Sequence, residues 1–159
     1  MTDITLDRID RKILFELMQD STLPVAQLAE KVGLSQTPCW KRVQKLEAAG
    51  IITGRVALVD PARIGLGLTV FVEIEAADHS NSWRNAFAAL VPEYTEIVEI
   101  HRMAGDVDYL LKVIVPDMDA FDAFYLDLTT RLPCRNVTSK FSMERIKDTT
   151  RLPIDTVTA

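Results

Sequence analysis

The first third of the chain spaces its apolar residues with the period of a helix. Apolar positions recur three or four residues apart over 9–18 and again over 25–32, which places them on one face of each helix. Pro24 stands where the second helix would begin, and Gly33 can supply the left-handed turn that follows a helix. The pattern predicts two short amphipathic helices, the second ending in a tight glycine turn.

A third helix is expected from Ser35 to Gly50. Ser35 is placed to cap this helix by accepting a hydrogen bond from a free backbone N–H, and Pro38 is tolerated in the first turn. Val43 and Leu46 would face the core. Two helices joined by a tight turn, the second rich in cations, are typical of a helix-turn-helix.

The segment after the third helix alternates around a glycine. Residues 51–58 therefore resemble a small β-wing, and Asp60-Pro61 marks a linker. The expected N-terminal domain, residues 1–60, is a winged helix-turn-helix.

In the rest of the chain, segments with the apolar pattern of a strand are interspersed with segments that have the pattern of a helix. Alternating or β-branched apolar residues predict strands, and three- and four-residue spacing predicts helices. The expected order is a strand at 68–74, a helix at 80–91, strands at 95–103 and 109–115, a helix up to residue 132, and a strand at 137–143.

This βαββαβ order is that of a ferredoxin-like domain. The fold class is therefore α+β, an N-terminal winged helix-turn-helix plus a C-terminal ferredoxin-like domain. We expect the second domain at 61–150 and a loosely attached C-terminal tail at 151–159.

Composition narrows the class of protein. Apolar content of 48% and charged content of 26% are ordinary for a globular protein. No apolar run approaches the roughly 18–20 residues that span a bilayer, and the N-terminus lacks the blocks of a signal peptide. Cys39 and Cys134 stand far apart with no metal-type spacing. We expect a cytoplasmic chain with reduced thiols and no membrane partner.

Charge divides the chain unevenly. Residues 1–60 are neutral, whereas residues 61–159 carry the whole net charge of −5. The neutral part concentrates Lys41, Arg42 and Lys45 in one predicted helix. These cations suit the phosphates of a DNA groove, although an ordinary amphipathic helix with a solvated basic side has the same pattern.

In a DNA-binding helix, different residues would contact the phosphates and the base edges. Hydroxyl and amide groups at the helix start can donate to phosphate or base edges. Gln36 and Arg42 can make paired hydrogen bonds to a purine edge, and Arg55 in the wing would touch backbone. Trp40 either stacks on DNA or packs inside the domain. The candidate DNA-binding residues are Ser35, Gln36, Thr37, Pro38, Trp40, Lys41, Arg42, Lys45 and Arg55.

An acidic turn in the second domain is a candidate ligand site. In Gly105-Asp106-Val107-Asp108-Tyr109, two carboxylates could hold the ammonium of an amino acid and the glycine N–H its carboxylate. Acidic turns between strands are commonplace, so the turn alone is weak evidence.

The reactive side chains of the second domain suggest an enzyme as the other class of protein. His101, Cys134, Asp106 and Asp108 could be drawn as a nucleophile with its base, but no activating motif, phosphate-binding glycine loop or zinc spacing accompanies them. We expect no enzyme, no catalytic residues, no metal and no cofactor. The alternative is an amino-acid-binding oligomeric module, or a small enzyme of ferredoxin-like fold, without DNA binding. This alternative leaves the cationic helix unexplained.

Three motifs carry a family resemblance: Leu6-Asp7-x-x-Asp10, Val32-Gly33-Leu34-Ser35-x-Thr37-Pro38-Cys39, and Gly105-Asp106-x-Asp108-Tyr109. With them, the chain from about Leu6 to Pro153 resembles the Lrp/AsnC family of transcriptional regulators. Trp40-Lys41-Arg42 and the stretches at 64–68 and 149–154 look closest to the branch associated with cysteine sensing.

The resemblance implies a sequence-specific DNA-binding regulator of amino-acid metabolism, modulated by a small amino-acid effector such as cysteine. It implies a homodimer that assembles to an octamer and binds an operator in double-stranded DNA, an inverted repeat. The implied effector-binding residues are Met103, Ala104, Gly105, Asp106, Val107, Asp108, Tyr109, Thr138 and Ser139.

Overall fold

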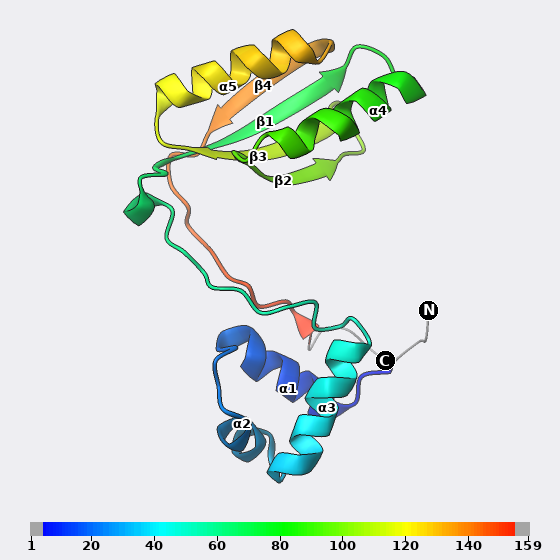
Figure 1. Cartoon of the computed structure of the whole chain (residues 1–159), viewed down its shortest axis with the longest axis vertical. Helices are drawn as coiled ribbons and strands as arrows, with labels where there is room; N and C mark the ends of the chain where they lie inside the picture. Colours follow the sequence, from blue (N-terminus) through cyan, green and yellow to red (C-terminus); the bar gives the residue numbers. More distant parts are fainter. Residues whose placement is uncertain (1–4, 155–159) are drawn as a thin grey trace. The chain divides into compact units, whose positions relative to one another are not determined.

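The computed structural model describes residues 5–154, which form two compact units (Figure 1). One unit contains residues 5–58 together with 147–154, and the other contains residues 59–146. Each unit buries its own apolar cluster. The last five residues of the expected tail, 155–159, lie outside the described residues, as do residues 1–4.

The N-terminal unit is a bundle of three helices, as expected. These are α1 (Arg8–Gln19), α2 (Val25–Val32) and α3 (Gln36–Ala48). Gly33 ends α2 in the left-handed conformation with φ 76°, which a side chain would disfavour. The buried apolar residues that hold the helices together are Ile13, Leu14, Leu28, Ala29, Val32, Cys39, Val43 and Leu46.

A reciprocal capping box starts α1. The Asp7 carboxylate accepts hydrogen bonds from the backbone N–H groups of Ile9 and Asp10, both at 2.8 Å. In return, the Asp10 carboxylate accepts from the Asp7 N–H at 3.2 Å. Both carboxylates therefore lie at the positive end of the α1 dipole, where negative charge is stabilising.

Ser35 occupies the N-cap of α3, but its hydroxyl does not cap, contrary to the prediction. An N-cap side chain bonds the N–H of the second or third helical residue. Here the third residue is Pro38, which has no N–H. The Ser35 side chain is exposed.

The expected β-wing has no strand in the structure. Backbone N–H groups of Ile51 and Ile52 bond back to the Leu46 carbonyl at 3.0 and 3.2 Å, and the chain from residue 53 to 60 is exposed and irregular. Alternation of apolar residues predicts a strand only where a second strand is available to pair with it. No segment of the described chain pairs with residues 51–58.

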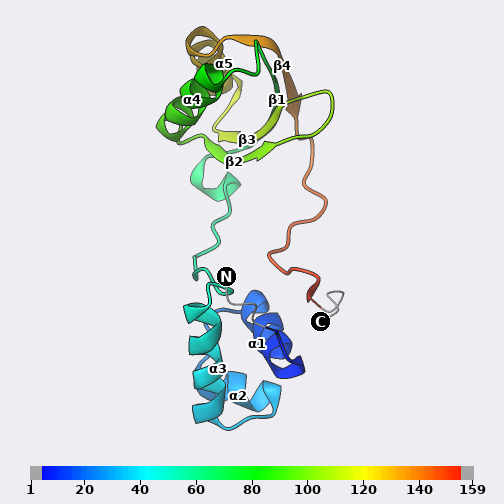
Figure 2. The ribbon, with the colours of Figure 1, turned by 90° about the vertical axis from the view of Figure 1, so that its right-hand side faces the viewer.

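The C-terminal segment packs against α1, whereas the sequence suggested a loose tail. The Arg11 guanidinium donates to the Ile154 carbonyl at 2.8 Å, and the Thr150 hydroxyl donates to the Met18 carbonyl at 3.1 Å. Ile154 also packs on the helical core. Residues 147–154 thus belong to the helical unit (Figure 2).

The C-terminal unit is a four-stranded antiparallel sheet in the order β2-β3-β1-β4. Its strands are β1 (Leu68–Ala76), β2 (Ile97–Arg102), β3 (Tyr109–Val115) and β4 (Cys134–Phe141). Helices α4 (Asn81–Leu90) and α5 (Met118–Arg131) lie on the same face of the sheet (Figures 1 and 2). The predicted βαββαβ order and the α+β class are confirmed.

Some helices and strands begin or end at other residues than expected, because backbone hydrogen bonds set their limits. Two 3-10 turns were not expected, η1 (Ala62–Ile64) and η2 (Val91–Glu93), and η2 carries Pro92 past the end of α4. Strand β4 begins at Cys134, three residues earlier than expected, because residues 134–136 still pair with the end of β1.

Helices cover one face of the sheet, and no helix of the described chain lies on the other face. Alternate β1 residues, such as Val72 and Ile74, are fully buried under α4 and α5. The uncovered face presents half-buried Phe71, Leu110 and Ile114, because side chains alternate across a strand.

Candidate nucleic-acid interface and effector site

The exposed face of α3 gathers the polar and cationic side chains expected of a DNA-reading helix. Residues four apart lie one above the other on a helix, so Gln36, Trp40 and Gln44 form one row. Thr37, Lys41 and Lys45 form the row beside it. All six side chains are exposed. Among residues 5–154, neither lysine is held in an ion pair.

The start of α3 adds unpaired backbone donors. The N–H groups of Gln36 and Thr37 precede the first intrahelical bond, which runs from the Cys39 N–H to the Ser35 carbonyl at 3.2 Å. Free N–H groups at the positive end of a helix dipole bind anions. With its hydroxyl unused as a cap, Ser35 can donate to the same anion.

Trp40 is exposed to 42% and is not part of the helical core. Its ring is accessible for stacking or for apolar contact with a thymine methyl group. Pro38 is exposed in the first turn of the same helix. Of the two sequence-based alternatives for Trp40, packing inside the unit is the less consistent with this exposure.

Arg42 does not lie with these residues. Its Nη1 atom donates to Asp7 Oδ2 at 2.5 Å and to Asp10 Oδ1 at 2.8 Å. The two hydrogen bonds raise the pKa of the guanidinium, and the Asp10 backbone N–H followed by Arg42 lowers the pKa of Asp7. The sequence suggested that Arg42 reads a base, but the structure turns it toward α1.

Arg55 is paired as well. Its Nη2 atom lies 2.9 Å from Glu47 Oε1 near the end of α3, with both side chains largely exposed. An exposed pair of this kind contributes little to stability, so Arg55 can exchange Glu47 for a phosphate at small cost.

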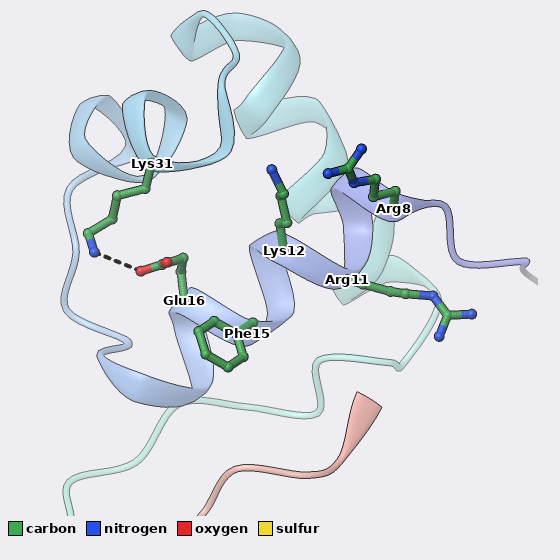
Figure 3. A pocket seen from close by; sticks show the side chains of 6 residues that line it. All are labelled: Arg8, Arg11, Lys12, Phe15, Glu16 and Lys31. Atoms are coloured by element: carbon green, nitrogen blue, oxygen red, sulfur yellow. Dashed lines mark hydrogen bonds and ion pairs between the residues drawn. The ribbon is translucent and has the colours of Figure 1, made fainter. Parts of the chain in front are cut away.

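A hollow of about 370 Å³ on α1 was not anticipated from the sequence (Figure 3). Lys31 of α2 closes one side through a 2.8 Å ion pair with Glu16. The hollow is lined by Arg8, Arg11, Lys12, Phe15, Glu16 and Lys31. Arg8 and Lys12 are exposed, and their two-residue separation from Asp10 places them on the opposite side of α1 from that buried carboxylate. The four-residue spacing of these two cations was the signal in the sequence.

The candidate effector loop joins β2 to β3. Gly105 has φ 137°, a conformation that L residues rarely adopt, and residues 103–106 are exposed. In the described chain the Asp106 carboxylate has no protein partner. A free carboxylate can accept hydrogen bonds from an ammonium group, and the N–H of the neighbouring Gly105 can donate to a carboxylate.

Asp108 differs from Asp106 because the fold uses both its backbone and its side chain. Its Oδ2 accepts the Ala76 N–H at 2.8 Å, its N–H donates to the Ile74 carbonyl at 2.9 Å, and its carbonyl accepts the Met103 N–H at 2.8 Å. The residue thus ties the loop to the end of β1. Of the two carboxylates that the sequence suggests as ligands of an ammonium group, that of Asp108 is therefore used to hold the fold.

The remaining candidates of this site are separated. Tyr109 on β3 and Val137, which precedes Thr138 on β4, both lie opposite Ile74 on either side of β1, so two strand spacings of about 4.8 Å each separate Tyr109 from the start of the Thr138 segment. Consecutive side chains point to opposite faces, so Thr138 and Ser139 do not serve one pocket within a chain. Tyr109 packs its ring on Trp83 and Phe87 at centroid distances of 5.6 and 4.5 Å, and Val107 is half-buried.

A cavity of about 20 Å³ beside Asp108 holds no more than a water molecule. His79 Nδ1 lies 3.5 Å from Asp108 Oδ1 there, and Arg84 and Arg102 line the same cavity. An amino acid does not fit this cavity in a single chain.

Within residues 5–154, the structure does not bring the remaining reactive side chains together as a nucleophile with its base. Burial raises the pKa of the thiols of Cys39 and Cys134, which lowers thiolate reactivity. His101 lies 3.5 Å from Glu99 on the uncovered face of the sheet. In residues 5–154, no three His, Cys, Asp or Glu side chains could share a metal ion, and no helix is long and apolar enough to cross a membrane.

Both units of the chain match known protein families. Residues 6–53 match a winged helix-turn-helix DNA-binding domain, and residues 69–152 match the Lrp/AsnC ligand binding domain.

Individual relatives cover nearly the whole chain. The DNA-binding transcriptional activator DecR of Escherichia coli is 52% identical over 151 residues, which are 94% of this chain and 99% of DecR. An AsnC family transcriptional regulator from Agrobacterium tumefaciens superposes with a TM-score of 0.89 at 56% identity, covering 94% of this chain and 97% of the other.

A transcriptional regulator from Neisseria meningitidis, solved as a complex with L-Met, superposes with a TM-score of 0.91 at 37% identity. The match covers 95% of this chain and 98% of the other. These relatives are named as regulators of transcription, not as enzymes.

Proposed function

Because the chain belongs to the Lrp/AsnC family of DNA-binding transcriptional regulators, with a helix-turn-helix and an amino-acid ligand-binding domain, we propose how its own residues divide that work. Helix α3 enters the DNA groove, and a small amino acid at the β2–β3 loop modulates the binding. The exposed double row on α3, with two unpaired lysines, carries the first part of this proposal.

The contacts to DNA fall into two classes. Lys41, Lys45 and the free N–H groups at the start of α3 meet phosphates, which position the protein without reading sequence. Gln36 and Trp40 face the base edges, since an amide pairs with an adenine edge and an aromatic ring contacts a thymine methyl. Thr37 and Ser35 donate at the helix start, and Arg55 contacts the flanking backbone.

The uncovered sheet face is the proposed surface for dimerisation. It carries half-buried Phe71, Leu110 and Ile114 among the ion pairs Lys112–Glu99 at 2.6 Å and Lys140–Glu73 at 2.5 Å. An apolar patch with paired charges fits a second copy of itself across a two-fold axis. A two-fold dimer presents two α3 helices to an inverted repeat, and further assembly of dimers leads to the octamer.

The effector site is proposed to be completed by assembly. Asp106 binds the ammonium group, the Gly105 N–H binds the carboxylate, and Asp108 holds the loop in place. Since the cavity in one chain holds only a water molecule, the side-chain pocket is formed where chains meet, with Thr138 or Ser139 contributed by a neighbouring copy. Cysteine is the first candidate effector, and the cytoplasm is where such a regulator meets both the chromosome and free amino acids.

The experiment begins with selection of a duplex from a randomised library by the unmodified chain. Band-shift titrations on that duplex are then made with each of the twenty amino acids, and thermal unfolding is followed in parallel. At least one amino acid, cysteine included in the panel, should change operator affinity and raise the melting temperature. Asp106→Asn should remove both effects and preserve DNA binding in the absence of effector. No response to any amino acid would contradict the sensing role, and failure to select a sequence would contradict the α3 contacts.

A further inference from the structure

We infer that Arg42 is a positioning residue, which fixes how α3 is presented to DNA and reads no base itself. The inference rests on the proposed DNA contacts of α3. It concerns the one cation of that helix that does not stand on its exposed face.

The three charged groups join two helices at a defined point. Arg42 leaves the middle of α3 and reaches both carboxylates of the α1 capping box, at 2.5 Å from Asp7 and 2.8 Å from Asp10. Asp10 is only 3% exposed. Because Asp7 and Asp10 are also held by backbone N–H groups of α1, the guanidinium attaches α3 to a rigid first turn.

Contact with a base would require this attachment to be broken. Withdrawal of the guanidinium would leave the buried Asp10 carboxylate without its charged partner, which is strongly unfavourable. The exposed Lys41 and Lys45 lose no such contact when they meet a phosphate.

The attachment controls a degree of freedom that apolar packing leaves loose. Burial of Cys39, Val43 and Leu46 holds α3 against the unit, but apolar contact is non-directional. Hydrogen bonds from Arg42 are directional, and they set the rotation of α3 about its own axis. That rotation decides whether Gln36 and Lys41 face outward together.

The test compares Arg42→Ala, Arg42→Lys and Asp10→Asn with the matched control Lys41→Ala. Affinities are measured over a series of NaCl concentrations on the duplex selected by the unmodified chain and on a duplex of unrelated sequence. Circular dichroism at the working temperature shows which variants keep their helices. Asp7→Asn, which leaves the buried pair intact, provides a milder variant.

If Arg42 positions the helix, Arg42→Ala and Asp10→Asn both weaken binding to the selected duplex, each by about tenfold or more. The salt slope stays unchanged, and a repeated selection returns the same base preferences. Arg42→Lys recovers part of the affinity, and Asp7→Asn causes a smaller loss. Lys41→Ala lowers the salt slope by about one, as expected for a lost phosphate contact.

Three results would overturn the inference. A salt slope lowered by about one in Arg42→Ala would show a phosphate contact. A preference relaxed at one base pair would show base reading. Unchanged or tighter binding by Asp10→Asn would show that Asp10 restrains a reading residue. The α3 contacts are tested separately, because they fail if Lys41→Ala leaves the slope unchanged, whatever Arg42 does.

Discussion

Arg42 Nη1 lies 2.8 Å from Oδ1 of Asp10, whose side chain is 5% exposed, so a positive charge on α3 is matched by a buried negative charge on α1. Removal of one partner from a buried ion pair typically costs about 3–5 kcal/mol. Since the Arg42 side chain is 34% exposed, we expect the lower end of that range.

The first prediction is therefore that Arg42→Ala lowers the free energy of opening of α1 and α3 by about 3 kcal/mol. Hydrogen exchange read by mass spectrometry in the full chain measures this quantity for each helix. Amides of α5, in the other unit, serve as the internal reference, and Lys41→Ala should stay within about 0.5 kcal/mol of the unmodified chain. Equal protection of α1 and α3 in Arg42→Ala would rule out a stabilising ion pair.

The second prediction concerns pH and the same capping box. The Asp10 N–H and the Arg42 guanidinium lower the pKa of Asp7 below its ordinary 3.8. A carboxyl group whose pKa is lower in the folded state contributes stability above its unfolded pKa, and loses it as pH falls through the folded value. The Asp7 carboxylate should therefore make a constant contribution to the free energy of unfolding from about pH 5 to 8. This contribution should decline below about pH 4.

Urea unfolding at a series of pH values checks this prediction. Asp7→Asn should be less stable than the unmodified chain at neutral pH, and the difference between them should shrink as the pH falls below about 4. A difference that does not change with pH would mean that the Asp7 charge has no part in the cap.

The third prediction separates the two carboxylates of the effector loop. Asp108→Ala leaves the Ala76 N–H without its 2.8 Å acceptor, and an unsatisfied buried donor costs about 1–3 kcal/mol. Asp106→Ala removes no contact within the described chain and should change stability by less than about 0.5 kcal/mol. Thermal unfolding of both variants, with and without effector, distinguishes them. The opposite order of stabilities would reverse the assigned roles.

The fourth prediction concerns the C-terminal segment. Ile154 packs its side chain on the helical core, so Ile154→Ala should lower the stability of the helical unit by about 1 kcal/mol, less than a fully buried truncation costs. Leu152 is 68% exposed, which makes Leu152→Ala the matched control. Exchange at α1 amides should rise in the first variant only. If both variants behave alike, the side chain of Ile154 has no special role.

Regular periodicity predicted most of the fold because it reports which face of an element is buried. Val72 and Ile74, or Val43 and Leu46, are buried as their spacing indicates. The strand expected at 51–58 is missing from the described chain, because alternation of apolar residues says nothing about a pairing partner. The docking of Ile154 was missed because a short segment without periodicity gives no signal before its neighbours are known.

The sequence likewise predicted some features of the candidate sites and missed others. The exposed row of Lys41 and Lys45 follows from helical spacing and charge. The role of Arg42 depends on two acids more than thirty residues away, and the division of labour between Asp106 and Asp108 depends on a hydrogen bond to a different strand. These distinctions depend on contacts between residues distant in sequence, so residue type alone could not predict them.

The chain leaves the helical unit near residue 58 and returns to it at residue 147, which has a consequence during synthesis. Domains generally fold in order as they emerge from the ribosome, yet here the helical unit acquires one of its packing residues, Ile154, only after the whole sheet domain has been translated. A newly made chain therefore completes its ligand-binding half before its DNA-binding half. A message truncated before the codon for Ile154 would yield a chain with the whole ligand-binding domain but without this packing residue of the helical unit.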